Sequence, residues 1–190
     1  MTLADEDPLG EAALRAAALA YLARYAATAE QVRRVLARRI RRHGGERDEP
    51  EAVVRGRIDA VVARLVAAGL ISDRDFAETR AAGLMRRGTS TRRIAALLRD
   101  RGVPDALAAA VIVDLDQIHG PERERFAALR HAQRRRLGPW AAPGRRADRR
   151  RRDLAAMVRA GFAPALATWV IDLEPEAAAQ ALDQAASSPE

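Results

Sequence analysis

The chain has 190 residues, a formal net charge of +7 and no cysteine, and 48% of its residues are hydrophobic while only 4% are aromatic. The lack of cysteine excludes a disulfide framework, a thiolate metal site and a cysteine nucleophile. A composition rich in alanine and poor in aromatic residues favours closely packed short helices over a sheet-rich core. We therefore expect an all-α protein.

The N-terminus is acidic where a secretory signal peptide would be basic, because Asp5, Glu6 and Asp7 precede the first apolar segment. We expect residues 1–11 to be an acidic, flexible N-terminus. The longest stretch without a charged residue is twelve residues long, 160–171, which is too short to span a bilayer. These features predict a cytoplasmic protein without a membrane segment.

Apolar residues recur at helical spacing along most of the chain and are separated by turns rich in glycine, proline and charge. The expected helices cover about residues 12–25, 28–42, 51–68, 73–88, 89–101 and 104–118. Glycine at the end of a helix typically acts as a C-terminal cap, which we expect at Gly69, Gly88 and Gly102. Ser72, and either Thr89 or Ser90, are expected to cap the helices that follow.

The stretch from Gly83 to Ser90 resembles a phosphate-binding loop, with two glycines followed by hydroxyl residues. A phosphate-binding loop needs a lysine before the hydroxyl residue and a strand before the loop. The sequence contains no lysine, and the preceding segment has helical periodicity. We therefore interpret Gly83 as a small helical residue and Gly88 as part of a turn between two helices.

The sequence repeats internally. At an offset of 59 residues, the segment Arg93–Ile112 falls on Arg152–Ile171, and at an offset of 62 the apolar positions of residues 94–98 fall on those of residues 32–36. Three repeats of three helices are predicted, at residues 12–71, 72–118 and 119–174, followed by an acidic, polar C-terminal tail at 175–190.

Each repeat is too small to form a rich core alone, so neighbours are expected to pack in line. We therefore expect an elongated, curved array of three tandem three-helix repeats that is monomeric. Chance similarity among helices rich in alanine, arginine and leucine is the alternative explanation of the offsets.

All 33 basic residues are arginines, and they are unevenly distributed. Residues 121–152 contain twelve arginines and three acidic residues, a local charge of +9, whereas the rest of the chain sums to −2. A basic region of this kind suits a polyanion or an acidic protein surface. Arginine usage in a GC-rich genome, with the side chains only solvating helices, is the alternative.

Arginines on the expected outer helix faces are candidate contacts. At about 100° per residue, Arg34, Arg38 and Arg41 lie opposite the apolar stripe of their helix. Arg92 and Arg99 lie about 20° apart on theirs. Arginine offers paired donors to phosphate and carboxylate groups. The candidate set is Arg34, Arg38, Arg41, Arg86, Arg87, Arg92, Arg99, Arg134, Arg135, Arg136, Arg149, Arg150, Arg151 and Arg152.

Residues that could perform enzyme chemistry are not arranged for it. His43, His119 and His131 are far apart in the sequence, and none has a second histidine at helical ligand spacing. No serine stands in a Gly-x-Ser-x-Gly motif. We expect no enzymatic activity, no catalytic residues, no cofactor and no metal.

The few aromatic residues are expected to be structural. Tyr21, Tyr25, Trp140 and Trp169 fall mostly at helix-periodic positions, which favours the core. Binding of single strands by base stacking therefore has little support from the sequence.

The central segment contains Gly69-Leu-Ile-Ser-Asp-Arg-Asp-Phe-Ala, followed by Gly88-Thr-Ser-Thr-Arg-Arg-Ile-Ala-Ala-Leu-Leu-Arg-Asp-Arg-Gly-Val. These two stretches resemble the second repeat of the RecX family of bacterial RecA regulators. The resemblance extends to Tyr21–Arg42, which is similar to the family's first-repeat helices, and to the three-by-three helix plan over residues 12–174.

The resemblance implies a non-enzymatic regulator of DNA recombination, DNA repair and the SOS response. Such a protein lies in the groove of the RecA filament, formed by RecA and single-stranded DNA, and inhibits filament growth, strand exchange, ATP hydrolysis and coprotease activity. Arg86 and Arg87 become candidate filament contacts. Weak direct DNA binding is left open.

Two other functions remain as alternatives. The pairs of segments Asp73–Gly88 and Thr89–Arg101 could act as a helix-turn-helix-like reader in an autonomous DNA-binding protein, which would bind duplex DNA without RecA. A structural helical adaptor is the second alternative, and it would have no salt-sensitive partner.

Overall fold

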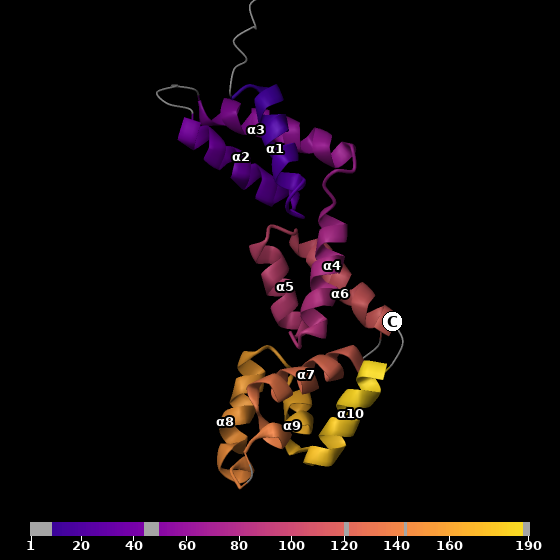
Figure 1. Cartoon of the computed structure of the whole chain (residues 1–190). Coiled ribbons are helices and arrows are strands. Elements are labelled where there is room, and N and C mark those ends of the chain that lie inside the picture. Colours follow the sequence, from indigo (N-terminus) through magenta and orange to yellow (C-terminus); the bar gives the residue numbers. More distant parts are fainter. Residues whose placement is uncertain (1–8, 44–49, 120–121, 143, 188–190) are drawn as a thin grey trace, which may run out of the picture. The chain divides into compact units, whose positions relative to one another are not determined.

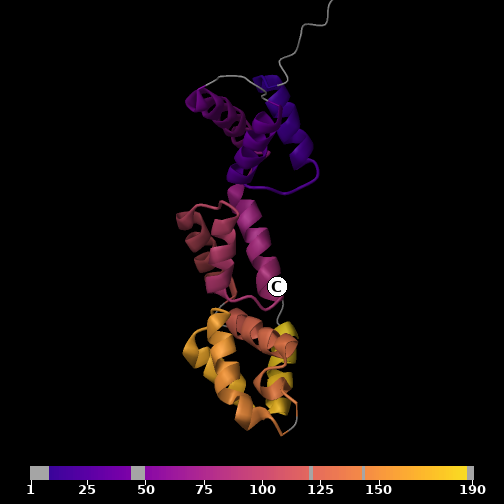
Figure 2. The same ribbon diagram turned by 90° about the vertical axis from the view of Figure 1, so that its left-hand side faces the viewer.

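The computed structural model describes residues 9–43, 50–119, 122–142 and 144–187. Across those ranges every regular element is helical, with ten α-helices and one short 3₁₀ helix (Figure 1, Figure 2). The expected all-α class is therefore confirmed. The chain divides into two compact units, which we call the first and second unit. The first extends to Phe76 and includes Arg101–Val103, and the second comprises Ala77–Asp100 and the chain from Pro104 onward.

Three helices form most of the first unit: α1 (Glu11–Leu22), α2 (Ala29–His43) and α3 (Glu51–Ala67). All three contribute to one apolar core, whose fully buried members include Leu14, Val32, Leu36, Val61, Val62 and Leu65. The apolar residues of α2 are spaced three and four apart and so share one helical face. Its arginines consequently lie on the remaining faces.

Helix α4 (Asp73–Arg86) lies between turns that the sequence anticipated. The amide of Asp75 donates a hydrogen bond of 3.1 Å to Ser72 Oγ, so Ser72 caps this helix as predicted. Gly69, after α3, and Gly88, after α4, have φ angles of +70° and +79°. This left-handed conformation lets amides beyond the helix end bond to its last carbonyls, so both predicted helix ends are confirmed.

The second unit holds the later part of α4 together with the remaining helices. These are α5 (Thr91–Asp100), α6 (Asp105–His119), α7 (Glu122–Arg135), the 3₁₀ helix η1 (Gly138–Trp140), α8 (Arg146–Arg159), α9 (Pro164–Asp172) and α10 (Pro175–Ser187). The largest fully buried side chains here are Met85, Ile94, Leu98, Val111, Leu129 and Met157.

Both expected terminal segments are shorter than the sequence suggested. Residues 175–187, expected as a polar tail, form α10, which packs on α7. Ala178 and Leu182 are buried because they are four residues apart and therefore share one face of α10. At the other end Leu9, assigned to the flexible N-terminus, is buried, and its carbonyl accepts a hydrogen bond from Arg57. Residues 1–8 and 188–190 lie outside the described residues.

Gly88 marks a close approach between two helices of the second unit. A Cβ atom at this glycine would be 2.8 Å from the amide nitrogen of His131 and 3.0 Å from the carbonyl oxygen of Ala127. Both neighbours are backbone atoms of α7. His131 Nδ1 also lies 3.3 Å from the Gly88 carbonyl. The glycine is therefore needed both for its backbone conformation and for the space that a side chain would occupy.

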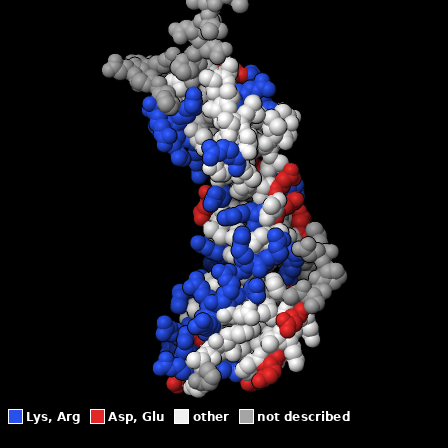
Figure 3. Space-filling view, in the orientation of Figure 1, with Lys and Arg blue, Asp and Glu red and all other residues white. Residues whose placement is uncertain are grey.

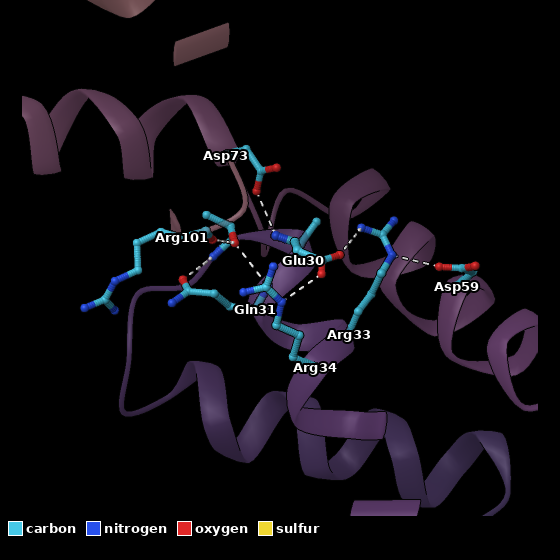
Figure 4. A network of polar contacts seen from close by, with 9 residues as sticks. Glu30, Gln31, Arg33, Arg34, Asp59, Asp73 and Arg101 are labelled. Carbon is cyan, nitrogen blue, oxygen red and sulfur yellow. Dashed lines mark hydrogen bonds and ion pairs between the residues drawn. The ribbon is translucent and has the colours of Figure 1, made fainter. Parts of the chain in front are cut away.

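In the first unit, the N-terminus of α2 is the centre of a polar network (Figure 4). The hydroxyl of Thr28 accepts a hydrogen bond from the amide of Gln31, and the Gln31 side chain accepts one from the amide of Thr28. This reciprocal arrangement is a capping box. The same hydroxyl donates to the Arg101 carbonyl at 2.7 Å, and Asp73 accepts a bond from the amide of Ala29.

A matching contact recurs in the second unit. Ser90, the cap of α5, accepts a hydrogen bond from the amide of Arg93 and donates one of 2.6 Å to the carbonyl of Ala160. Ser90 lies 62 positions after Thr28, and Ala160 lies 59 positions after Arg101. These are the two offsets of the sequence repeat. The contact thus supports the internal repetition, while the bounds of the three repeats and the elongated shape stay predictions.

Candidate functional site

The candidate arginines are at the surface. All fourteen are exposed except Arg149, which is half-buried. On the face shown in Figure 3, basic side chains gather over α2 in the first unit and over α7 and α8 in the second, whereas acidic side chains lie towards α10. The arginines therefore differ in their local partners rather than in their access to solvent.

Several candidates already contact an acidic side chain. Arg34 is 2.8 Å from Glu30, and Arg150 makes two hydrogen bonds of 2.7 Å to Asp172. These bonds hold the pKa of Asp172 below its usual value. Exposed pairs of this kind contribute little to stability, so they can exchange for an external partner.

Arg149 has a structural environment. Its Nε atom lies 3.7 Å from the carboxylate of Asp153, which is 1% exposed. The other Asp153 oxygen accepts a hydrogen bond of 3.0 Å from the amide of Gly138 at the start of η1. Arg149 thus compensates a buried charge that positions the connection between α7 and α8, and it is the weakest member of the candidate set.

The structure brings three candidates together at the C-terminus of α4, and we call Arg86, Arg87 and Arg134 the α4 cluster. A Cβ atom on Gly83 would be 3.5 Å from Arg87 Nη2 and 4.0 Å from Arg86 Nη2, so both guanidinium groups lie over one turn of α4. Arg134, on α7, donates a hydrogen bond of 2.6 Å to the Arg87 carbonyl. Positive charge is favoured at this end of the helix dipole.

The other central candidates are placed differently. Arg92 is exposed on α5, and its Cβ would be 3.5 Å from a Cβ atom on Gly161. Arg99, near the end of α5, lies 3.7 Å from Asp105. From the sequence, the candidate arginines could be grouped only by the helix that carries them. Arg134 lies 47 residues after Arg87, so only the structure shows that it belongs to the α4 cluster.

Two aromatic residues expected in the core lie at the surface instead. Tyr25 is 51% exposed and Trp169 is 38% exposed, whereas Tyr21 and Trp140 are partly buried. Tyr25 follows the end of α1, so the helical phase no longer determines which way it points. The guanidinium of Arg125 lies 5.6 Å from the centre of the Trp169 ring.

A second arginine group was not recognised as one in the sequence. Arg38 lines a cavity of about 570 Å³ between α1 and α2, together with Arg24, Arg39 and Arg42. Tyr21 and Tyr25 line the same cavity. The sequence shows arginines in α2 and two tyrosines near the end of α1. Only the packing of α1 on α2 shows that these arginines and tyrosines line the same cavity.

No cluster of three or more potential ligands suited to a metal ion occurs in the described part of the chain. Its helices also include none with the length and apolar character needed to cross a membrane.

His131 is partly buried, and burial lowers its pKa, with the positive charges of Arg135 and Arg134 acting in the same direction.

Comparison with known proteins decides the family. A family model described as RecX, second three-helix domain, matches residues 72–112. The chain is 46% identical over 167 residues to the regulatory protein RecX of Myxococcus xanthus (strain DK1622), covering 85% of this chain and 86% of that protein. The chain belongs to the RecX family. It is also 33% identical over 170 residues to the regulatory protein RecX of Mycobacterium sp. (strain KMS), with 88% and 87% covered.

Solved structures agree with the fold. The crystal structure of RecX from Lactobacillus salivarius superposes with a TM-score of 0.62 at 18% identity, covering 92% of this chain and 97% of that one. A second crystal structure, of a regulatory protein RecX, gives a TM-score of 0.61 at 20% identity, with 86% and 74% covered. The helical architecture of the family is therefore present in this chain.

Proposed function

We propose that this RecX-family protein regulates RecA by binding the filament that RecA forms on single-stranded DNA. Binding limits filament growth and suppresses strand exchange, ATP hydrolysis and coprotease activity. The protein would act without enzymatic chemistry of its own, in the cytoplasm, in DNA recombination, repair and the SOS response. The regulatory names of its relatives and the α4 cluster support this proposal.

The α4 cluster is the single observation that carries the interface. Two of its members, Arg86 and Arg87, lie inside the segment that matches the family model, and all three are exposed. Neighbouring guanidinium groups can bind the carboxylate and phosphate groups of a charged filament groove. Arg92 and Arg99 on α5 extend the proposed contact, and the basic α8 supports it.

The test is the ATPase activity of RecA on single-stranded DNA, measured with increasing amounts of this protein. We expect inhibition by the wild type. A triple variant, Arg86→Gln, Arg87→Gln and Arg134→Gln, should need about tenfold more protein for half-inhibition. Its inhibition should also depend less on salt, because fewer ion contacts form on association.

The matched control carries Arg15→Gln, Arg55→Gln and Arg64→Gln, three exposed arginines outside the α4 cluster, α5 and α8, with the same change in net charge. This control should inhibit as the wild type does. If the cluster variant keeps its circular dichroism and inhibits with unchanged potency and salt dependence, the proposed interface is wrong. If the wild type binds duplex DNA but leaves RecA unaffected, an autonomous DNA-binding function replaces the proposal.

A further inference from the structure

The cavity between α1 and α2 combines positive charge with aromatic surface. Its lining includes Arg24, Arg38, Arg39 and Arg42, together with Tyr21, Tyr25 and small apolar side chains. Its volume, about 570 Å³, falls within the range of about 300–1,000 Å³ typical of small-molecule sites. No described acidic residue lines it. The cavity therefore suits an anionic ligand that also has an apolar part.

Five of the six arginines of α2 fall into two groups. Near the N-terminus, Arg33 contacts Asp59 and Glu30, and Arg34 contacts Glu30. By contrast, Arg38, Arg39 and Arg42 make no ion pair with any acidic side chain in the described part of the chain. Repulsion among these cations is thus not compensated by described carboxylates, which favours binding of an external anion.

Arg39 adds a more specific feature. Its Nε atom is buried and has no hydrogen-bond partner among the described residues. A buried donor without an acceptor costs about 1–3 kcal/mol, so such groups are rare unless a ligand or water completes them. The Nε atom itself is closed to the cavity, but Arg39 is among the lining residues, so its positive charge adds to the attraction for a phosphate there.

The tyrosines supply aromatic surface at the same place. The ring centres of Tyr21 and Tyr25 are 5.1 Å apart, and the planes are inclined by 40°. The guanidinium of Arg24 lies 5.6 Å from the centre of the Tyr25 ring, which supports that ring through a cation–π contact. Tyr25 is nevertheless 51% exposed, so a ligand in the cavity can contact part of its surface.

We propose that this cavity binds one nucleotide of a single-stranded nucleic acid. The base stacks on Tyr25, and the phosphate contacts Arg38, Arg39 and Arg42. A basic groove beside an aromatic ring is the combination by which single strands are bound without sequence preference. A base inside a duplex is stacked on both faces and cannot reach the ring. An acidic peptide would use the arginines but leave Tyr25 without a role.

The test measures fluorescence anisotropy of a labelled twenty-residue oligothymidylate with the full chain at low salt, without RecA. We expect Tyr25→Ala to weaken binding about fivefold to 150-fold, the range for loss of one stacked base. Tyr25→Phe keeps the ring and should bind as the wild type does. The double variant Arg38→Gln and Arg42→Gln should weaken binding and lower its salt dependence, because fewer phosphate contacts form.

The control is the double variant Arg15→Gln and Arg55→Gln, which changes the net charge equally at exposed positions outside the cavity. It should bind nearly as the wild type does. An unchanged affinity in Tyr25→Ala, or equal losses in the two double variants, would overturn the proposal. So would a duplex or a polyglutamate peptide that binds as tightly as the single strand. Since RecA is absent, failure here leaves the proposed function to its own ATPase test.

Discussion

Replacing Gly88 by alanine adds a single Cβ atom and so tests how closely the second unit is packed at this residue. The residue is buried, its φ angle is +79°, and an added Cβ would lie 2.8 Å from the His131 amide nitrogen and 3.0 Å from the Ala127 carbonyl oxygen. Both atoms belong to the backbone of α7, which cannot turn aside as a flexible side chain would. Relief of the clash requires α4 and α7 to separate.

The magnitude follows from separate contributions. A left-handed conformation costs alanine about 1–2 kcal/mol, and an overpacked site costs about 1–3 kcal/mol. The smaller conformational entropy of the unfolded alanine chain offsets about 0.4–1 kcal/mol. We therefore expect Gly88→Ala to lower the free energy of unfolding by about 2–4 kcal/mol.

Two other glycines separate these contributions. Gly69 has a φ of +70° but nothing within 4 Å of an added Cβ, so Gly69→Ala should cost only the conformational strain, about 1 kcal/mol. Gly56 lies within α3 and also has open space, so Gly56→Ala should stabilise the protein by about 0.5–1 kcal/mol.

Urea unfolding followed by circular dichroism provides the measurement for all three variants. The expected order, from the most to the least stable protein, is Gly56→Ala, wild type, Gly69→Ala and Gly88→Ala. If Gly88→Ala and Gly69→Ala lose the same free energy within about 0.5 kcal/mol, the close approach of α7 to Gly88 does not exist in solution.

Two further predictions concern polar groups of the second unit. Ser90 is fully buried and makes hydrogen bonds to Arg93 and Ala160, so Ser90→Ala should lower the free energy of unfolding by about 1–3 kcal/mol. Ser72→Ala, at a more exposed cap, should lower it by about 0.5–1 kcal/mol. Thermal melts of the two variants measure this difference, and equal losses of free energy would contradict the prediction. Burial lowers the pKa of His131, and the charges of Arg135 and Arg134 act in the same direction, so together they outweigh the hydrogen bond to Gly88, which raises it. On acidification the unfolded chain therefore takes up the proton at a higher pH than the folded chain does. The free energy of unfolding should fall as pH decreases from about 6.5 through the lower folded-state pKa. Urea titrations at pH 7.5 and 5 measure this fall, which should be smaller in His131→Gln. An equal fall in the variant and the wild type would contradict the role of His131.

Much of the local structure was predictable because its causes are local. Ser72 caps α4 through an amide three residues away, and the left-handed glycines end helices whose periodicity is visible in the sequence. α10 was missed because its buried face depends on tertiary packing. Its average polarity resembles a tail, and only its packing on α7 shows that Ala178 and Leu182 form a buried face.

The candidate site was predictable only in part. Periodicity placed Arg34, Arg38 and Arg41 at the surface, where the structure has them. It failed for Tyr25, which lies beyond the last residue of α1 and therefore follows no helical phase. It also could not pair Arg38 with Tyr25, since their proximity depends on how α1 packs on α2.

The sequence by itself determined the helical class, the helix ends, the basic character and the family resemblance, because periodicity, caps and charge act over a few residues. The tertiary structure decided which distant groups meet. Arg134 reaches the Arg87 carbonyl, Gly88 faces the backbone of α7, and arginines of α2 line one cavity with the tyrosines in α1 and beyond its end. Such contacts depend on the packing of whole helices, in which many small apolar contacts act together and no single residue carries the information.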